Sequence, residues 1–152
     1  MYRRILVAIE NSAADRTIVE HIAHLAKLTG AELLLVHVAD GWAARHFDEL
    51  NLRESEEMKA DRAYLDQLQS GLRAEGLRVE TELAMGDPAT ELVRAAETHH
   101  ADLIAMATHG HRFLSDVVHG QTADRVRHLV KIPVLMLRAH PAPSTQHPAP
   151  ST

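Results

Sequence analysis

Four short apolar runs, none of which alternates with polar residues, constrain this chain more than any other feature of its sequence. They cover residues Ile5–Ile9, Leu33–Val36, Leu103–Ala107 and Ile132–Leu137. A strand with one wet face alternates between apolar and polar residues, whereas a strand covered by helices on both faces is apolar throughout. The four runs therefore predict strands of a parallel sheet whose two faces are both buried.

A fifth segment, Leu77–Leu83, does alternate, with leucine, valine and threonine set against arginine and glutamate. This pattern predicts a strand nearer the edge of the sheet, with one face exposed to water. Between the strands, apolar residues recur at helical spacing in residues 18–26, 58–72, 92–96 and 126–130, and Gly30 follows the first of these segments as a C-terminal cap. The alternation predicts an α/β domain with a five-stranded parallel sheet and helices on both faces.

The composition of the 152-residue chain suggests one globular domain and argues against several classes of function. The formal net charge is −5 and aromatic residues make up 3%, which argues against nucleic acid and anionic membranes as partners. The absence of cysteine excludes disulfides, thiolate zinc sites and a cysteine nucleophile. The first apolar run is too short for a signal peptide or a membrane span, so we expect a cytoplasmic protein.

The C-terminal segment differs in composition from the rest of the chain. Residues 140–145 read His-Pro-Ala-Pro-Ser-Thr and recur as residues 147–152. A segment this rich in proline cannot build a core. We therefore expect a domain over residues 1–139 and a disordered or extended tail over residues 140–152.

Ligands of open α/β sheets bind beyond the carboxyl ends of the strands, where the strand order reverses. This rule points to the loop after the first strand, Glu10–Ser12, and to the loop that begins at Ala107 after the fourth. The second loop reads Ala107-Thr108-His109-Gly110, then nine residues, then Gly120-Gln121-Thr122. Its glycines would let a ligand approach the backbone, and a helix start after the loop would favour a phosphate. Turn geometry is the alternative role of the glycines, and Thr122 would either cap the helix or contact the phosphate.

Several blocks of the sequence resemble the universal stress protein family. They are Ile5–Ile9, Gly86–Ala89, Ala101–Gly110 and Ile132–Leu135, and the resemblance extends over residues 2–138. It implies a doubly wound, Rossmann-like sheet of the adenine-nucleotide-binding kind and a homodimer. Because some members of the family bind ATP, the resemblance also implies ATP or AMP as the ligand, with Mg²⁺ beside ATP.

The ATP-binding members share a glycine, two residues, a glycine, nine residues and a glycine followed by serine or threonine. Gly110 and Gly120 match the second and third glycines, whereas Ala107 replaces the first. Gln121 takes the hydroxyl position, and Thr122 follows it by one residue.

Further positions follow from the same resemblance. Glu10 stands where those members have an aspartate near the ribose and adenine, and Val38 stands at a position that lines the adenine pocket. His109 stands where the family commonly has a histidine, and a cationic histidine there would suit the phosphates. Independently of the resemblance, Arg112 and Arg125 flank the loop and would pair either with phosphate or with surface acids.

Two alternatives to nucleotide binding remain. The departures at Glu10, Ala107 and Gln121 are also consistent with a member that has lost the nucleotide and acts as a dimeric interaction module through the last strand, Val134–Leu137. A metal binder is the second alternative, because three histidines of the loop could act as ligands: His109, His111 and His119. The phosphate loop of NTPases, the dinucleotide fingerprint and the nucleophile elbow are absent, so we expect binding rather than catalysis, with slow nucleotide hydrolysis left open.

Overall fold

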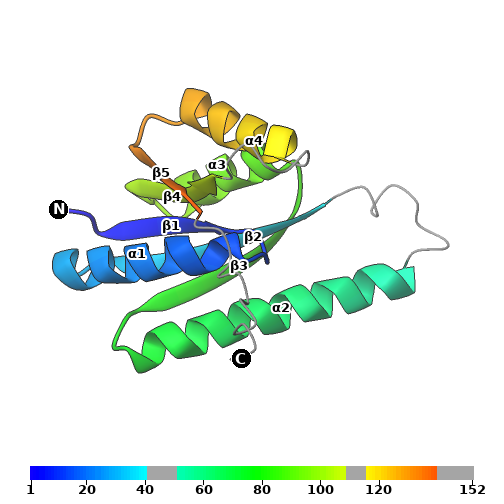
Figure 1. Ribbon diagram of the computed structural model, residues 1–152, viewed down its shortest axis with the longest axis horizontal. Helices are drawn as coiled ribbons and strands as arrows, with labels where there is room; N and C mark the ends of the chain where they lie inside the picture. The colour runs from blue at the N-terminus through cyan, green and yellow to red at the C-terminus, as the bar shows by residue number, and fades with distance from the viewer. Residues whose placement is uncertain (41–50, 109–115, 140–152) are drawn as a thin grey trace, which may run out of the picture.

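Five strands form one parallel sheet in the order β3-β2-β1-β4-β5 (Figure 1). The structure is a computed structural model that describes residues 1–40, 51–108 and 116–139. Its elements are β1 (Arg4–Ile9), α1 (Ala14–Thr29), β2 (Glu32–Asp40), α2 (Asn51–Ala74), β3 (Val79–Gly86), α3 (Pro88–Thr98), β4 (Leu103–Thr108), α4 (Asp116–Leu129) and β5 (Val134–Arg138). The doubly wound parallel sheet predicted from the sequence is confirmed.

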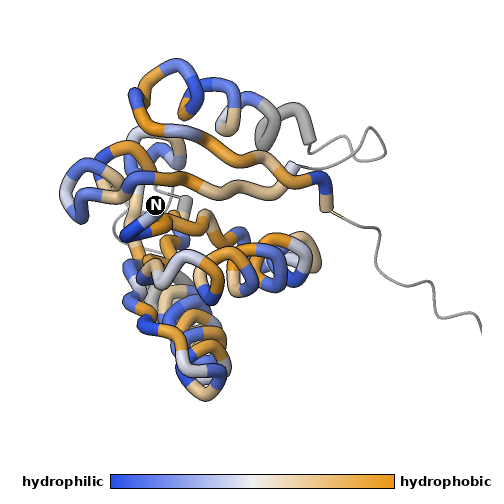
Figure 2. The backbone as a smooth tube through the Cα atoms, turned by 90° about the vertical axis from the view of Figure 1, so that its left-hand side faces the viewer, coloured by the Kyte–Doolittle hydropathy of each residue, from blue (hydrophilic) through white to orange (hydrophobic). Residues whose placement is uncertain are grey.

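Two separate cores explain why the strands are apolar at every position. Ile5, Val7 and Ile9 of β1 pack on the side of α1 and α2, whereas Leu6 and Ala8 pack on the side of α3 and α4. All five side chains are at most 8% exposed. Figure 1 shows the two helix layers on opposite faces of the sheet, and much of the hydrophobic colour in Figure 2 runs along the strands between them.

Helix α1 shows how local sequence sets the ends of these elements. Its buried stripe includes Ile18, Ile22 and Ala26, which recur at helical spacing and face the sheet. Gly30 ends the helix in the left-handed conformation, with φ of 73°, and its N–H donates to the carbonyl oxygen of Ala26 at 2.8 Å. The cap predicted at Gly30 is therefore confirmed.

The edge strand β3 confirms the position predicted from its alternating pattern, although it begins at Val79 rather than at Leu77. Leu77 is instead buried in the connection from α2, where it is 9% exposed. The carbonyl oxygen of Val79 accepts hydrogen bonds from Nε2 of Gln69 at 2.8 Å and from Nη2 of Arg73 at 2.9 Å. Side chains of α2 therefore cover the start of this edge.

The opposite edge of the sheet is β5, which begins at Val134 rather than at Ile132. Its apolar side chains are only partly covered, and Met136 is 41% exposed. Among the described residues, no helix combines the length and the apolar character that crossing a membrane requires. The tail predicted for residues 140–152 lies outside the described residues, so the division of the chain at residue 139 remains a prediction.

Two glycine-to-alanine changes should have opposite effects on stability. Gly30→Ala places a Cβ on a left-handed residue and should lower the free energy of unfolding by about 1 kcal/mol. Gly71→Ala, in the interior of α2 where open space surrounds the new Cβ, should raise it by about 0.5–1 kcal/mol. Urea titrations followed by circular dichroism measure both effects, and equal shifts in the two variants would contradict the cap assigned to Gly30.

Candidate functional site

The strand order reverses between β1 and β4, which lie side by side in the centre of the sheet (Figure 1). From β1 the chain proceeds outward through β2 to β3, and it then returns to the other side of β1 to form β4 and β5. The segments that follow β1 and β4 therefore leave the sheet at the same edge. The reversal of strand order that the sequence rule requires is therefore present between β1 and β4, and the ligand site predicted there remains a prediction.

A buried carboxylate holds the loop that follows β1. Asp15, in the first turn of α1, is 1% exposed and accepts hydrogen bonds from three successive backbone N–H groups. These donors are Glu10 at 2.8 Å, Asn11 at 2.8 Å and Ser12 at 3.2 Å. The hydroxyl of Tyr64, on α2, donates to the same carboxylate at 2.7 Å. One side chain thus fixes the backbone of the whole loop.

Burial and hydrogen bonding have opposite effects on the pKa of Asp15. Burial raises the pKa of the Asp15 carboxyl, and this effect outweighs the lowering caused by its N–H and hydroxyl donors. Burial and the bond to Asp15 likewise raise the pKa of Tyr64 well above its ordinary value. Because the folded pKa of Asp15 is raised, its contribution to stability is fully present at acid pH and is lost as the pH rises through that value.

A second polar contact joins the same loop to α2. Asn11 has a left-handed backbone, with φ of 60°, and its Nδ2 donates to Oδ1 of Asp61 at 2.9 Å. His37, on β2, places Nδ1 2.7 Å from the carbonyl oxygen of Ile9 and Nε2 3.4 Å from Oδ2 of Asp61. Since a carbonyl oxygen only accepts, Nδ1 of His37 carries a proton.

The sequence carries no motif that singles out Asp15, Tyr64, Asp61 or His37. An acid in the first turn of a helix is common because it stabilises the positive end of the helix dipole. The partners of Asp15 and Asn11 on α2 lie 49 and 50 residues away along the chain, so no local pattern reveals them.

Three of the predicted ligand residues lie on or beside the central strands. Glu10 is half-buried, and its Oε2 accepts a hydrogen bond from the Ser12 hydroxyl at 3.1 Å. Val38 is half-buried beside the core formed with α3 and α4, whereas Ala107 is 6% exposed and belongs to the core formed with α1 and α2. The structure therefore places the side chains of Val38 and Ala107 on opposite faces of the sheet.

The remaining predicted residues follow β4. Gln121 is exposed and Thr122 is half-buried, and both lie inside α4 together with Gly120. The expectation that Thr122 caps this helix is wrong, because α4 begins at Asp116, more than a turn earlier. His109 and Gly110 lie outside the described residues.

The metal alternative also falls largely outside the described part of the chain. His111 and the side chain of His119 are not described there, so the set predicted from His109, His111 and His119 remains untested. Within residues 1–40, 51–108 and 116–139, no three histidine, aspartate or glutamate side chains gather as metal ligands.

Arg125 links the two helices on one face of the sheet. Its Nη1 donates to Oδ1 of Asp87 at 2.9 Å, while Oδ2 of Asp87 accepts from the Thr90 N–H at 3.0 Å and from the Thr90 hydroxyl at 2.6 Å. Asp87 is thus the N-cap of α3 and the partner of a cation on α4. Of the two roles predicted for Arg125, the structure contains the pairing with a surface acid.

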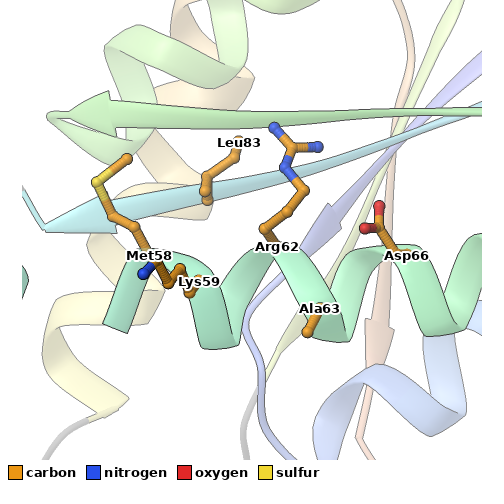
Figure 3. A pocket seen from close by; sticks show the side chains of 6 residues that line it. All are labelled: Met58, Lys59, Arg62, Ala63, Asp66 and Leu83. Carbon is orange, nitrogen blue, oxygen red and sulfur yellow. The ribbon is translucent and has the colours of Figure 1, made fainter. Parts of the chain in front are cut away.

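An open groove of about 480 Å³ lies between α2 and the edge strand β3 (Figure 3). It is lined by Met58, Lys59, Arg62, Ala63, Asp66 and Leu83. The groove lies beside the edge strand β3, which β2 separates from β1 and from the reversal of strand order between β1 and β4. It therefore does not coincide with the predicted ligand site.

Comparison with known families agrees with the resemblance seen in the sequence. The sequence model of the Universal stress protein family matches residues 1–138. The universal stress protein MJ0531 of Methanocaldococcus jannaschii is 30% identical, over 91% of this chain and 83% of that protein. The universal stress protein YxiE of Bacillus subtilis is 28% identical, over 91% of this chain and 100% of that protein.

Solved structures share the fold. The M. jannaschii protein MJ0577 superposes with a TM-score of 0.80 at 24% identity, covering 93% of this chain and 99% of that one. A universal stress protein in complex with cAMP has a TM-score of 0.66 at 20% identity, covering 90% and 97% of the two chains. One from Archaeoglobus fulgidus in complex with dAMP has a TM-score of 0.62 at 22% identity, covering 89% and 97%.

The pair between Asp87 and Arg125 predicts how stability changes with pH. The hydrogen bond from Arg125, followed by those from Thr90, holds the pKa of Asp87 well below its ordinary value of 3.8. The ionised Asp87 carboxylate therefore stabilises the folded protein at pH values above its pKa in the unfolded chain. This contribution to stability is lost as the pH falls and the carboxylate is protonated.

Asp87→Asn keeps an oxygen that can cap α3 but removes the charge that faces Arg125. Wild type should therefore exceed this variant in free energy of unfolding at neutral pH, and the gap should shrink as the pH falls below about 4. Urea titrations over a pH series measure the gap. A difference in free energy of unfolding that stays constant over that series would show that the ion pair with Arg125 does not lower the pKa of Asp87.

Proposed function

Since the chain belongs to the universal stress protein family, we propose that it binds an adenine nucleotide, ATP or AMP, where β1 and β4 end. The observation that carries this proposal is the reversal of strand order between β1 and β4. Ligands of open parallel sheets bind at such a point because the helices that follow the two strands diverge to opposite faces. The nucleotides named for the cAMP and dAMP complexes of similar fold support the same class of ligand.

Glu10 and Val38 would contact the ribose and adenine. Glu10 follows β1 directly, and Val38 lies near the end of the adjacent strand β2, so both stand at the carboxyl edge of the sheet. Val38 is half-buried and apolar, which suits the face of a base, and a glutamate carboxylate can accept from ribose hydroxyls.

The phosphates would lie on the other side of the reversal, along the segment from Ala107 to Thr122. Gly110 and Gly120 would let the backbone approach the phosphates, while His109, Gln121 and Thr122 would donate to them. Ala107 would contribute only backbone, because its side chain is buried in a core. Mg²⁺ would accompany ATP by neutralising its phosphate oxygens.

We propose binding and response rather than turnover, in the cytoplasm. A phosphate chain bound along Gly110–Gly120 would change a surface that a partner protein reads. Such a response requires only that the ligand bind one conformation of the protein better than another.

The nucleotide proposal predicts a thermal shift. AMP or ATP at one hundred times its dissociation constant should add about 2.7 kcal/mol to stability, which is roughly 5–10 °C in Tm for a chain of this size. Differential scanning fluorimetry with millimolar nucleotide measures the shift. Wild-type protein that shows no shift with either nucleotide would contradict the proposal.

Gly120→Val should abolish this shift, because a branched side chain would crowd the phosphates. Gly71→Val is the matched control, since it makes the same change in a helix, α2, that is remote from the proposed phosphate segment. The control should melt at or slightly above the wild-type temperature, because valine is a better helix former than glycine and open space surrounds a Cβ at Gly71. Only the control should still show the thermal shift with nucleotide. A shift retained by Gly120→Val would show that the phosphates do not bind beside residue 120.

We further propose a homodimer formed through β5. This strand lies at the sheet edge with its apolar side chains half-exposed, and pairing it across a two-fold axis would cover them. The same surface would serve the interaction module expected if nucleotide binding has been lost.

Leu135→Lys should convert this dimer into monomers, because it places a charge beside the paired edge. Size-exclusion chromatography with light scattering measures the mass, and circular dichroism checks that the variant remains folded. Leu28→Lys alters an exposed leucine on α1, 86% accessible, and should leave the dimer intact. A folded Leu135→Lys protein that stays dimeric would place the interface elsewhere.

A further inference from the structure

Two residues of α2 reach the loop after β1 from one face of the helix. Asp61 and Tyr64 are three residues apart and are therefore neighbours on the helix surface. Asp61 accepts from the Asn11 side chain at 2.9 Å, and Tyr64 donates to Asp15 at 2.7 Å. Both residues of α2 are half-buried.

The hydrogen bonds of Asp61 and Tyr64 add to the apolar packing of α2, in which the Tyr64 ring also takes part. Leu65 and Leu72 are buried in the core shared with α1, and Leu68 packs against it. Burial of these leucines holds the helix on the sheet whether or not its polar groups reach the loop. Asp61 and Tyr64 thus add a directional contact whose partners lie in the loop and at the start of α1.

The loop needs such support because its conformation is unfavourable by itself. A left-handed backbone is uncommon for any residue other than glycine, and asparagine tolerates it best when its side chain is hydrogen-bonded. The side-chain amide of Asn11, whose φ is 60°, has that bond to Asp61. On the other side of the loop, the N–H of Glu10 donates to the same Asp15 carboxylate that Tyr64 contacts.

We propose that Asp61 and Tyr64 of α2 act as positioning residues that set the orientation of Glu10 toward the nucleotide. This inference rests on the proposed function, because Glu10 is the residue placed at the ribose. Tyr64 acts through Asp15, and Asp61 acts through Asn11, which is the neighbour of Glu10 in the chain. By linkage, bound nucleotide strengthens the contact between α2 and the loop as much as that contact strengthens binding.

The test uses two variants and two matched controls. Tyr64→Phe removes one hydroxyl and leaves the ring, while Tyr2→Phe makes the same change at the opposite end of β1. Asp61→Ala removes the acceptor of the Asn11 side-chain amide, while Asp66→Ala makes the same change on the exposed face of α2. The dissociation constant for AMP is measured by isothermal titration calorimetry well below the Tm of every variant.

Tyr64→Phe and Asp61→Ala should each weaken AMP binding about fivefold, as expected for the loss of one positioning hydrogen bond. Tyr2→Phe and Asp66→Ala should bind AMP as wild type does. Unchanged affinity in Tyr64→Phe and Asp61→Ala, even with a lower Tm, would overturn the proposal, because the contacts would then serve stability alone.

Hydrogen exchange separates this inference from the proposed function. The backbone amides of Glu10, Asn11 and Ser12 should exchange faster in the Tyr64 and Asp61 variants than in wild type or either control. Wild-type protein that binds neither AMP nor ATP would overturn the proposed function. In that case accelerated exchange would still support positioning of the loop by α2, and unchanged exchange would overturn it.

Discussion

Burial of β1 on both faces is the constraint on which the rest of this structure depends. Ile5 and Leu6 are both 0% exposed although they point to opposite sides of the sheet. A strand of this kind requires a helix layer on each face, and short right-handed connections supply the two layers only if the chain leaves β1 in one direction and returns on the other. The reversal of strand order beside β1 follows from that requirement, and it is where we propose that the ligand binds.

The same constraint leaves backbone N–H groups in need of hydrogen-bond acceptors where β1 ends. Its backbone leaves a dry core with three successive N–H groups that lie outside the strand ladder, and Asp15 accepts from all three. Taking that carboxylate out of water is costly, as its raised pKa shows, so further donors are valuable. The hydroxyl of Tyr64 is such a donor, and through it the stability of the loop depends on a helix that is distant in sequence.

Most of the fold could be predicted from the sequence, including the reversal of strand order at which we propose the ligand site, because short-range patterns identify the strands and helices. Continuous apolar runs identify buried strands, Gly30 ends α1, and the alternation at Glu80 identifies an edge strand. The start of α4 could not be predicted in this way, because residues 116–120 carry no apolar repeat that continues into Val126. The contacts made by Asp15 and Asp61 depend on which face α2 turns toward the loop, and that is a property of tertiary packing.

The two edges of the sheet differ in a way that bears on how copies of the chain can assemble. Gln69 and Arg73 occupy a backbone acceptor at the start of β3, whereas β5 presents a partly exposed apolar edge. If both edges accepted strands, copies could add head to tail without limit and grow into fibres. Because α2 covers the start of β3, pairing of the proposed kind through β5 alone would be self-complementary and would stop at two copies. Gln69 and Arg73 would thereby limit growth of the sheet from copy to copy, although β5 exposes apolar side chains.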